Sequence, residues 1–134
     1  MNKIEAVVKK IEASDAVHVV TFSAKSEEFT MMALELPNRV KEGIKVTLGI
    51  KPSFVLIAKS KSKDISLTNQ INATITSIEA GRLLVTLKLK SPVGVFESLI
   101  TRKSYNMMNL RENQSVVVMM KASEISIVEV NDGV

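Results

Sequence analysis

The chain has 134 residues, of which 46% are hydrophobic and 24% are charged, and its formal net charge is +4. This balance is typical of one soluble globular domain or two very small ones, and it excludes a disordered chain. The lack of cysteine excludes disulfides, thiolate nucleophiles and cysteine-ligated zinc, and a single histidine excludes a multi-histidine metal site within one chain. No apolar run approaches the roughly 20 residues of a membrane helix and no secretion signal follows Met1, so we expect a cytoplasmic protein.

Strands dominate the predicted elements, because valine, isoleucine and threonine together make up 37 residues while glycine contributes five. In chain order, strands are predicted over 4–11, 17–22, 29–34, 45–50 and 54–58, and then over 69–80, 83–89, 93–100, 115–120 and 125–128. The segment 101–109 is long enough for a short helix, with Thr101 as its N-cap. The corresponding segment 35–39 is shorter, and Pro37 argues against a regular helix there.

The two halves of the chain repeat each other. Residues 2–13 match residues 69–80 with 6 of 12 identities at an offset of 67, and residues 41–46 and 51–53 match residues 111–116 and 121–123 at an offset of 70. The spacer Lys59-Ser60-Lys61-Ser62-Lys63 lies between the halves. We interpret it as a solvated linker in preference to a binding patch. We therefore expect two repeats, residues 1–62 and residues 63–134.

The order of elements in each repeat is three strands, a short helix or loop, and two more strands. This order is typical of a five-stranded barrel of the OB type. The predicted fold class is therefore all-β, with two tandem five-stranded OB-like barrels and a short helix in the second. A barrel of about 65 residues has a thin core, so we also expect self-association.

Several motifs resemble the Mop domain, also called the TOBE or molbindin family. The segment Ser66-Leu67-Thr68-Asn69-Gln70 resembles the family's opening pattern Ser-Ala-Arg-Asn-Gln. The resemblance continues, in the same order as in the family, through residues 78–81, 99–104, 110–113 and 121–123. Because it covers both halves, the chain resembles a di-Mop molbindin, a class that binds molybdate or tungstate without a redox cofactor.

The resemblance implies an oxyanion site in the second repeat. Molybdate and tungstate are tetrahedral dianions, so their site needs hydroxyl and amide donors together with a cation. The family's positions fall on side chains of the second repeat and on the backbone N–H groups at its start, namely Ser66, Leu67, Thr68, Thr101, Ser104, Lys121 and Ser123. Family sites lie between subunits, so the resemblance also implies a homo-oligomer, with a trimer favoured, and allows a site shared between chains.

The sequence departs from the family at two places. Thr68 stands where the family has arginine, which removes a positive charge and a forked donor. The first repeat keeps only Lys51 and Ser53 as a possible degenerate site, and Glu35 near that position would repel an anion. The expected function is binding of molybdate or tungstate for intracellular storage, buffering or homeostasis.

Other interpretations stay open. A ligand-free oligomerisation or regulatory module would need none of these donors. OB barrels also bind single-stranded nucleic acid, but that requires stacking aromatics on one face, and four phenylalanines with one tyrosine do not recur at a common strand position. His18 is expected to be an exposed or hydrogen-bonded side chain and not a metal ligand. The paired methionines are expected to fill the core or to form subunit contacts, and not to bind metal. No catalytic motif is visible, so we do not expect an enzyme.

Overall fold

The structure, a computed structural model, describes residues 1–131 of the chain. The first half contains β1 (Asn2–Ser14), β2 (Val17–Ala24), β3 (Glu27–Ala33), β4 (Lys45–Ile50), the 3₁₀ turn η1 (Pro52–Phe54) and β5 (Val55–Ala58). The second half contains β6 (Asn69–Ala80), β7 (Leu84–Ser91), β8 (Gly94–Thr101), α1 (Arg102–Met108), β9 (Ser115–Met120), η2 (Ala122–Glu124) and β10 (Ser126–Asn131). The ten predicted strands and the short helix in the second half are confirmed. Among the described residues, no helix is long and apolar enough to cross a membrane.

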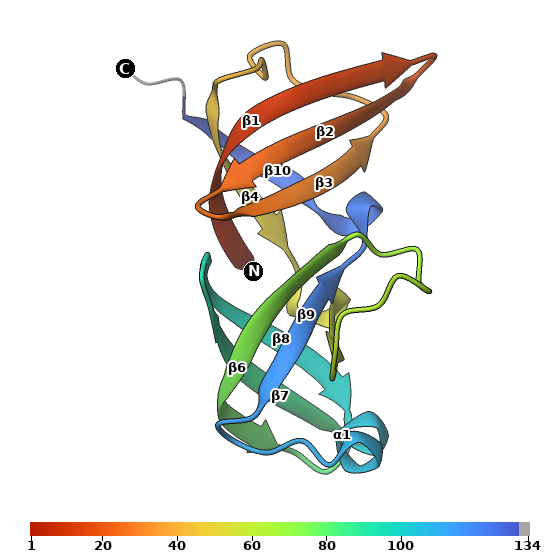
Figure 1. The fold of residues 1–134 in the computed structure, drawn as a ribbon, viewed down its shortest axis with the longest axis vertical. Helices are drawn as coiled ribbons and strands as arrows, with labels where there is room; N and C mark the ends of the chain where they lie inside the picture. Colours follow the sequence, from red (N-terminus) through yellow and green to blue (C-terminus); the bar gives the residue numbers. More distant parts are fainter. Residues whose placement is uncertain (132–134) are drawn as a thin grey trace.

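The strands form two five-stranded sheets, with the orders β10-β4-β1-β2-β3 and β5-β9-β6-β7-β8. The all-β fold class of two OB-like units is thereby confirmed (Figure 1). We call the sheet that contains β1 the first unit and the sheet that contains β6 the second unit.

The last strand of each half pairs in the sheet of the other half. Val55 of β5 lies opposite Met120 of β9, and Ile127 of β10 lies opposite Leu48 of β4, both in antiparallel pairs. Nothing in the sequence pattern predicts this exchange. The two repeats present equivalent edges, so exchanging equivalent strands changes few local contacts.

Both repeats have the same irregularity at the equivalent place in their first strand. β1 has a bulge just after Val8, and β6 has one just after Ile75, which is 67 residues later. At each bulge, the carbonyl of the residue before the bulge accepts a hydrogen bond from a backbone N–H of a residue with positive φ. Gly43 (φ 89°) donates to the Val8 carbonyl at 2.8 Å, and Asn113 (φ 67°) donates to the Ile75 carbonyl at 2.7 Å. The sequence repeat is therefore a structural repeat as well.

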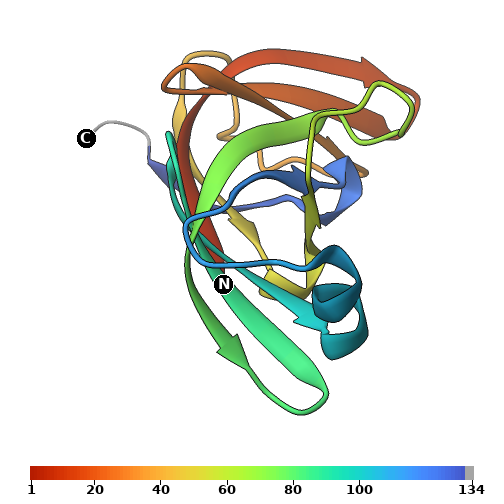
Figure 2. The same cartoon turned by 60° about the horizontal axis from the view of Figure 1, so that its bottom comes forward.

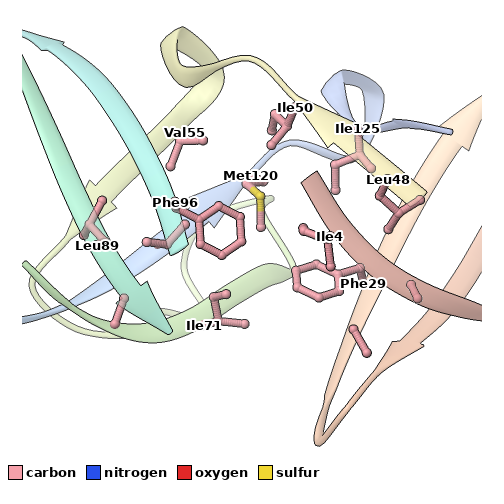
Figure 3. Close-up of a cluster of buried hydrophobic side chains, with 14 of the residues drawn as sticks. Ile4, Phe29, Leu48, Ile50, Val55, Ile71, Leu89, Phe96, Met120 and Ile125 are labelled. Atoms are coloured by element: carbon pink, nitrogen blue, oxygen red, sulfur yellow. The ribbon is translucent and has the colours of Figure 1, made fainter. Parts of the chain in front are cut away.

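One hydrophobic core runs through both units. Figure 3 shows Phe29 of β3 and Phe96 of β8, two fully buried side chains at equivalent repeat positions, with Ile4, Ile71 and Met120 around them. A five-stranded unit of this size buries little apolar surface alone. The shared core means that each unit completes the other, and Figure 2 shows the same two units packed together from a second direction.

Two buried asparagines join the units. The Asn69 side chain, 1% exposed, donates to the Thr30 carbonyl at 2.8 Å and accepts from the Thr30 N–H at 2.7 Å. The Asn2 side chain, 7% exposed, makes the same pair of bonds with the backbone of Glu97, at 2.8 and 2.7 Å. Because β3 and β8 are the outer strands of their sheets, each carboxamide satisfies an edge that has no further strand beside it.

We predict that Asn69→Ala lowers the free energy of unfolding by about 2 kcal/mol, because two hydrogen bonds are lost and the Thr30 amide and carbonyl are left without partners in a part-buried place. Urea denaturation measures the change. Asn72→Ala, on the exposed face of the same strand, is the control and should shift stability by less than about 0.5 kcal/mol. Equal effects of the two substitutions would contradict the role assigned to Asn69.

Candidate functional site

The Thr101–Ser104 pair lies where β8 ends and α1 begins. The Thr101 Oγ1 accepts a hydrogen bond from the Ser104 N–H at 3.1 Å and donates one to the Ser104 Oγ, also at 3.1 Å. The predicted N-cap is thereby confirmed. Thr101 is exposed and Ser104 is half-buried, and the first turn of α1 contains no acidic residue. Two hydroxyl groups are thus held together at a solvent-facing position.

A cation that the sequence motifs did not single out stands beside this pair. The backbone N–H of Arg102 donates to the Leu83 carbonyl at 2.8 Å, and its guanidinium donates to the Gly81 carbonyl at 2.9 Å. The same guanidinium lies 5.8 Å from the centre of the Tyr105 ring. Arg102 is therefore fixed against the β6–β7 turn, one residue from Thr101.

A second group of predicted site residues lies where β6 begins and β9 ends. Asn69 lies opposite Met120 in the β6–β9 ladder, so Thr68 and Lys121, the next residues outward, are at the same end of that ladder. Leu67 is buried against Val117 and Met119 and anchors the segment. Ser66, Thr68, Lys121 and Ser123 are all exposed.

Lys121 is a free cation in the described part of the chain, because its side chain forms no hydrogen bond or ion pair there. Its carbonyl accepts the N–H of Glu124 at 3.0 Å, which closes the turn η2. The half-buried Glu124 thus places a carboxylate-bearing residue within one turn of Lys121. The sequence motifs did not draw attention to it.

Within one chain the two groups are apart. The helix α1 and the turn η2 lie at opposite ends of the second unit (Figures 1 and 2). Thr101, which precedes α1, pairs with Leu84, and Leu84 lies near the last residue of β6, whereas Asn69 is its first residue. The structure therefore brings Thr101 next to Ser104, and Thr68 to the same end of the ladder as Lys121. It does not bring these two pairs together in a single copy.

Each repeat has a Lys-x-Ser triplet, residues 51–53 in the first and residues 121–123 in the second. The strand exchange places each triplet against the other half of the chain. The turn η1, which contains Ser53 and follows Lys51, packs against β8, and nearby the buried Ser98 hydroxyl donates to the Val55 carbonyl at 2.6 Å. The turn η2, which contains Ser123, packs against β3. Lys51 is exposed, with its Nζ 6.0 Å from the centre of the Phe54 ring.

Glu35 consequently faces different neighbours from those expected. It lines a largely apolar groove of about 640 Å³ together with Ser123, between the end of β3 and the start of β10. Lys51 does not line this groove. We expected the Glu35 carboxylate near the degenerate site of Lys51 and Ser53. It lies instead beside Ser123, in the triplet of the second repeat.

The paired methionines singled out in the sequence divide between buried and exposed positions. Met31, Met119 and Met120 are buried, whereas Met32 and Met107 are 43% and 75% exposed. His18 is half-buried in β2, and its Nδ1 has no hydrogen-bond partner. Over residues 1–131, no group of three His, Cys, Asp or Glu side chains is placed to hold a metal ion.

Comparisons with known proteins support the fold. A family model described as the TOBE domain matches residues 65–127. The chain is similar to the solved structure of the cytoplasmic molybdate-binding protein ModG in a molybdate-bound form, with a TM-score of 0.87, 20% sequence identity and coverage of 94% of each chain. At that identity the likeness shows the fold. No curated protein sequence matches the chain.

We predict that Thr101→Ala lowers the free energy of unfolding by about 1 kcal/mol, because the Ser104 N–H loses its capping partner. Thr101→Ser keeps the hydroxyl and is the matched control, so it should lower stability far less. Thermal or urea denaturation distinguishes the two. A serine variant as unstable as the alanine variant would show that the methyl group of Thr101, and not its hydroxyl, matters.

Proposed function

We propose that this chain, whose residues 65–127 belong to the TOBE domain family, binds molybdate or a closely similar tetrahedral oxyanion such as tungstate. One observation carries the proposal. The side chains to which the family resemblance assigns an oxyanion contact reach the surface, with Ser66, Thr101, Lys121 and Ser123 exposed and Ser104 half-buried. The shared fold with ModG, which is described as a molybdate-binding protein, supports the same conclusion.

The chemistry of these donors suits the ligand. A tetrahedral dianion has four acceptor oxygens, so it needs hydroxyl and N–H donors that converge from several directions and at least one positive charge. The Thr101–Ser104 pair supplies two adjacent hydroxyls. Lys121 supplies an ammonium group without a competing carboxylate partner in residues 1–131. The backbone N–H groups of Leu67 and Thr68 are the further donors that we assign.

The site is formed between copies of the chain. Lys121 follows the end of β9 that pairs with the start of β6, whereas the Thr101–Ser104 pair lies where β8 ends and α1 begins, at the other end of the second unit. A complete donor set therefore requires that one copy contribute the hydroxyl pair and another contribute Lys121 with Ser66 and Thr68. We propose a trimer of two-unit chains, by analogy with the family. Intracellular storage, buffering or homeostasis of the oxyanion is the role that such a protein would serve.

The nucleic-acid alternative is less well supported. Phe22, Phe29 and Phe96 are buried in the core, and of the described phenylalanines only Phe54 has a substantial exposed fraction, 37%. A single-strand binding face would need several exposed aromatic rings along its strands. The ligand-free oligomerisation module remains the competing hypothesis, and titration decides between it and oxyanion binding.

We predict that Lys121→Ala weakens molybdate binding by roughly ten- to a hundredfold, because one charge-assisted contact is lost. Isothermal titration with molybdate, tungstate and sulfate measures the effect. Lys51→Ala is the matched control at the equivalent repeat position and should change affinity much less. The reverse result would assign the site to Lys51, which the strand exchange places on the side of β8.

Restoring the family's arginine provides a gain-of-function test. We predict that Thr68→Arg tightens molybdate binding, because it adds a forked cationic donor at the start of β6. Thr68→Lys is the control for charge alone and should tighten binding less. If the wild-type chain and the arginine variant both give no heat with any oxyanion, the ligand-free module is the correct interpretation.

We predict that the chain self-associates, because the donor groups of the proposed site meet only across a contact between copies. Light scattering coupled to gel filtration should give the mass of a trimer at micromolar concentration. A monomer that still binds molybdate with unchanged affinity would contradict the shared site.

A further inference from the structure

A cationic groove lies on the outer face of the second unit, away from the proposed molybdate residues. It has a volume of about 770 Å³ and lies between the segment that follows β5, the middle of β6, the β7–β8 turn and the start of β9. Its polar lining includes Lys59, Lys61, Lys90, Asn72, Thr74 and Ser115. No acidic residue lines the groove, and neither Lys121 nor Thr101 does.

Strand register brings three of these residues together. Thr74 of β6 lies opposite Lys90 of β7 on one side and opposite Ser115 of β9 on the other. Residues directly opposite each other in antiparallel strands project to the same face of the sheet. A lysine, a threonine and a serine therefore form one row across three strands.

The linker holds the other two lysines at the edge of this row. The Gln70 side chain donates to the Ser62 carbonyl at 2.8 Å and accepts from the Ser62 N–H at 2.9 Å, which fixes the linker to the start of β6. Leu67 packs against Val117 and Met119 further along. The Lys-Ser segment is solvated, as the sequence predicts, but it is also tied down beside the groove.

The positive charge of the groove is not balanced within residues 1–131. Two ion pairs, Lys9 with Glu28 and Lys10 with Glu12, lie in the first unit. Lys59, Lys61 and Lys90 form no ion pair or side-chain hydrogen bond in this part of the chain. Three like charges around one depression attract an anion.

The first unit contains the equivalent groove with a different charge. That groove, of about 350 Å³, is lined by Glu5 where the second unit has Asn72, and by Ser23 where the second unit has Lys90. Asn131 takes the place of Lys61, whereas Lys25 and Lys45 stand where the second unit has Pro92 and Ser115, so the first-unit groove has two lysines and one carboxylate. Since the two units share one fold, the fold does not require the lysines or the absence of a carboxylate in the second unit.

We propose that the groove of the second unit binds a multiply charged phosphate-type anion, of the class of an oligophosphate. The lysines supply the charge, and the hydroxyls of Thr74 and Ser115 supply directed donors. The space exceeds that of one tetrahedral ion. No aromatic side chain lines it, so it offers no ring on which a nucleobase could stack. This site is separate from the proposed molybdate site and does not depend on it.

Titration of the full-length chain with inorganic triphosphate tests the proposal. The double variant Lys61→Ala/Lys90→Ala should weaken triphosphate binding by about tenfold or more. Asn72→Glu, which introduces the carboxylate of the first-unit groove, should abolish it. Lys45→Ala, which removes a lysine from the first-unit groove, is the matched control and should change affinity by less than about twofold. Far-UV circular dichroism verifies that each variant is folded.

The outcomes separate this site from the molybdate site. Lys121→Ala should leave triphosphate binding unchanged, and Lys61→Ala/Lys90→Ala should leave molybdate binding unchanged. Triphosphate binding that is lost in Lys121→Ala, or that persists in the double variant or in Asn72→Glu, overturns the proposal. A single-stranded oligonucleotide that binds more tightly than triphosphate, and that is lost in the same double variant, also overturns it and makes the groove a nucleic-acid site.

Discussion

The exchange of the last strand between the two halves is the constraint on which the rest of the molecule depends. β5 completes the second unit and β10 completes the first, so neither half of the chain contains all five strands of one sheet. Removing either strand from its host sheet would leave unpaired backbone groups and expose core residues such as Val55 and Ile125, which are 2% and 3% exposed. The two units must therefore form together, and their continuous core follows from that.

The short segment 66–70 contains both residues that hold the fold together and residues that are exposed at the surface. In the segment 66–70, Asn69 clamps the backbone of Thr30, Gln70 ties down the linker, and Leu67 packs on β9. Ser66 and Thr68 alternate with these residues and remain exposed. The structural residues hold the segment in place, and the exposed residues keep their donors available.

Duplication followed by exchange also separates the chemistry of the two halves. Each Lys-x-Ser turn packs against the third strand of the opposite half, so a site residue in one repeat acquires neighbours from the other. Glu35 shows the effect, because it lines a groove with Ser123 although the two residues belong to different repeats. The two outer grooves diverge in the same manner, with Glu5 and two lysines in one and three lysines without a carboxylate in the other. A duplicated fold can thus carry dissimilar surfaces at equivalent places.

The sequence by itself determined the elements of this protein, because strand periodicity, turn residues and the N-cap at Thr101 are local properties. It also determined that there are two repeats and which residue types are available as anion donors. Only the tertiary structure decided which strands pair, since two similar repeats present similar edges and local sequence cannot distinguish a strand's own sheet from its equivalent. For the same reason the structure alone decided that Lys121 and the Thr101–Ser104 pair lie apart within one chain. It also decided that the linker lysines meet Lys90 across a groove, because such meetings depend on contacts between residues far apart in the chain.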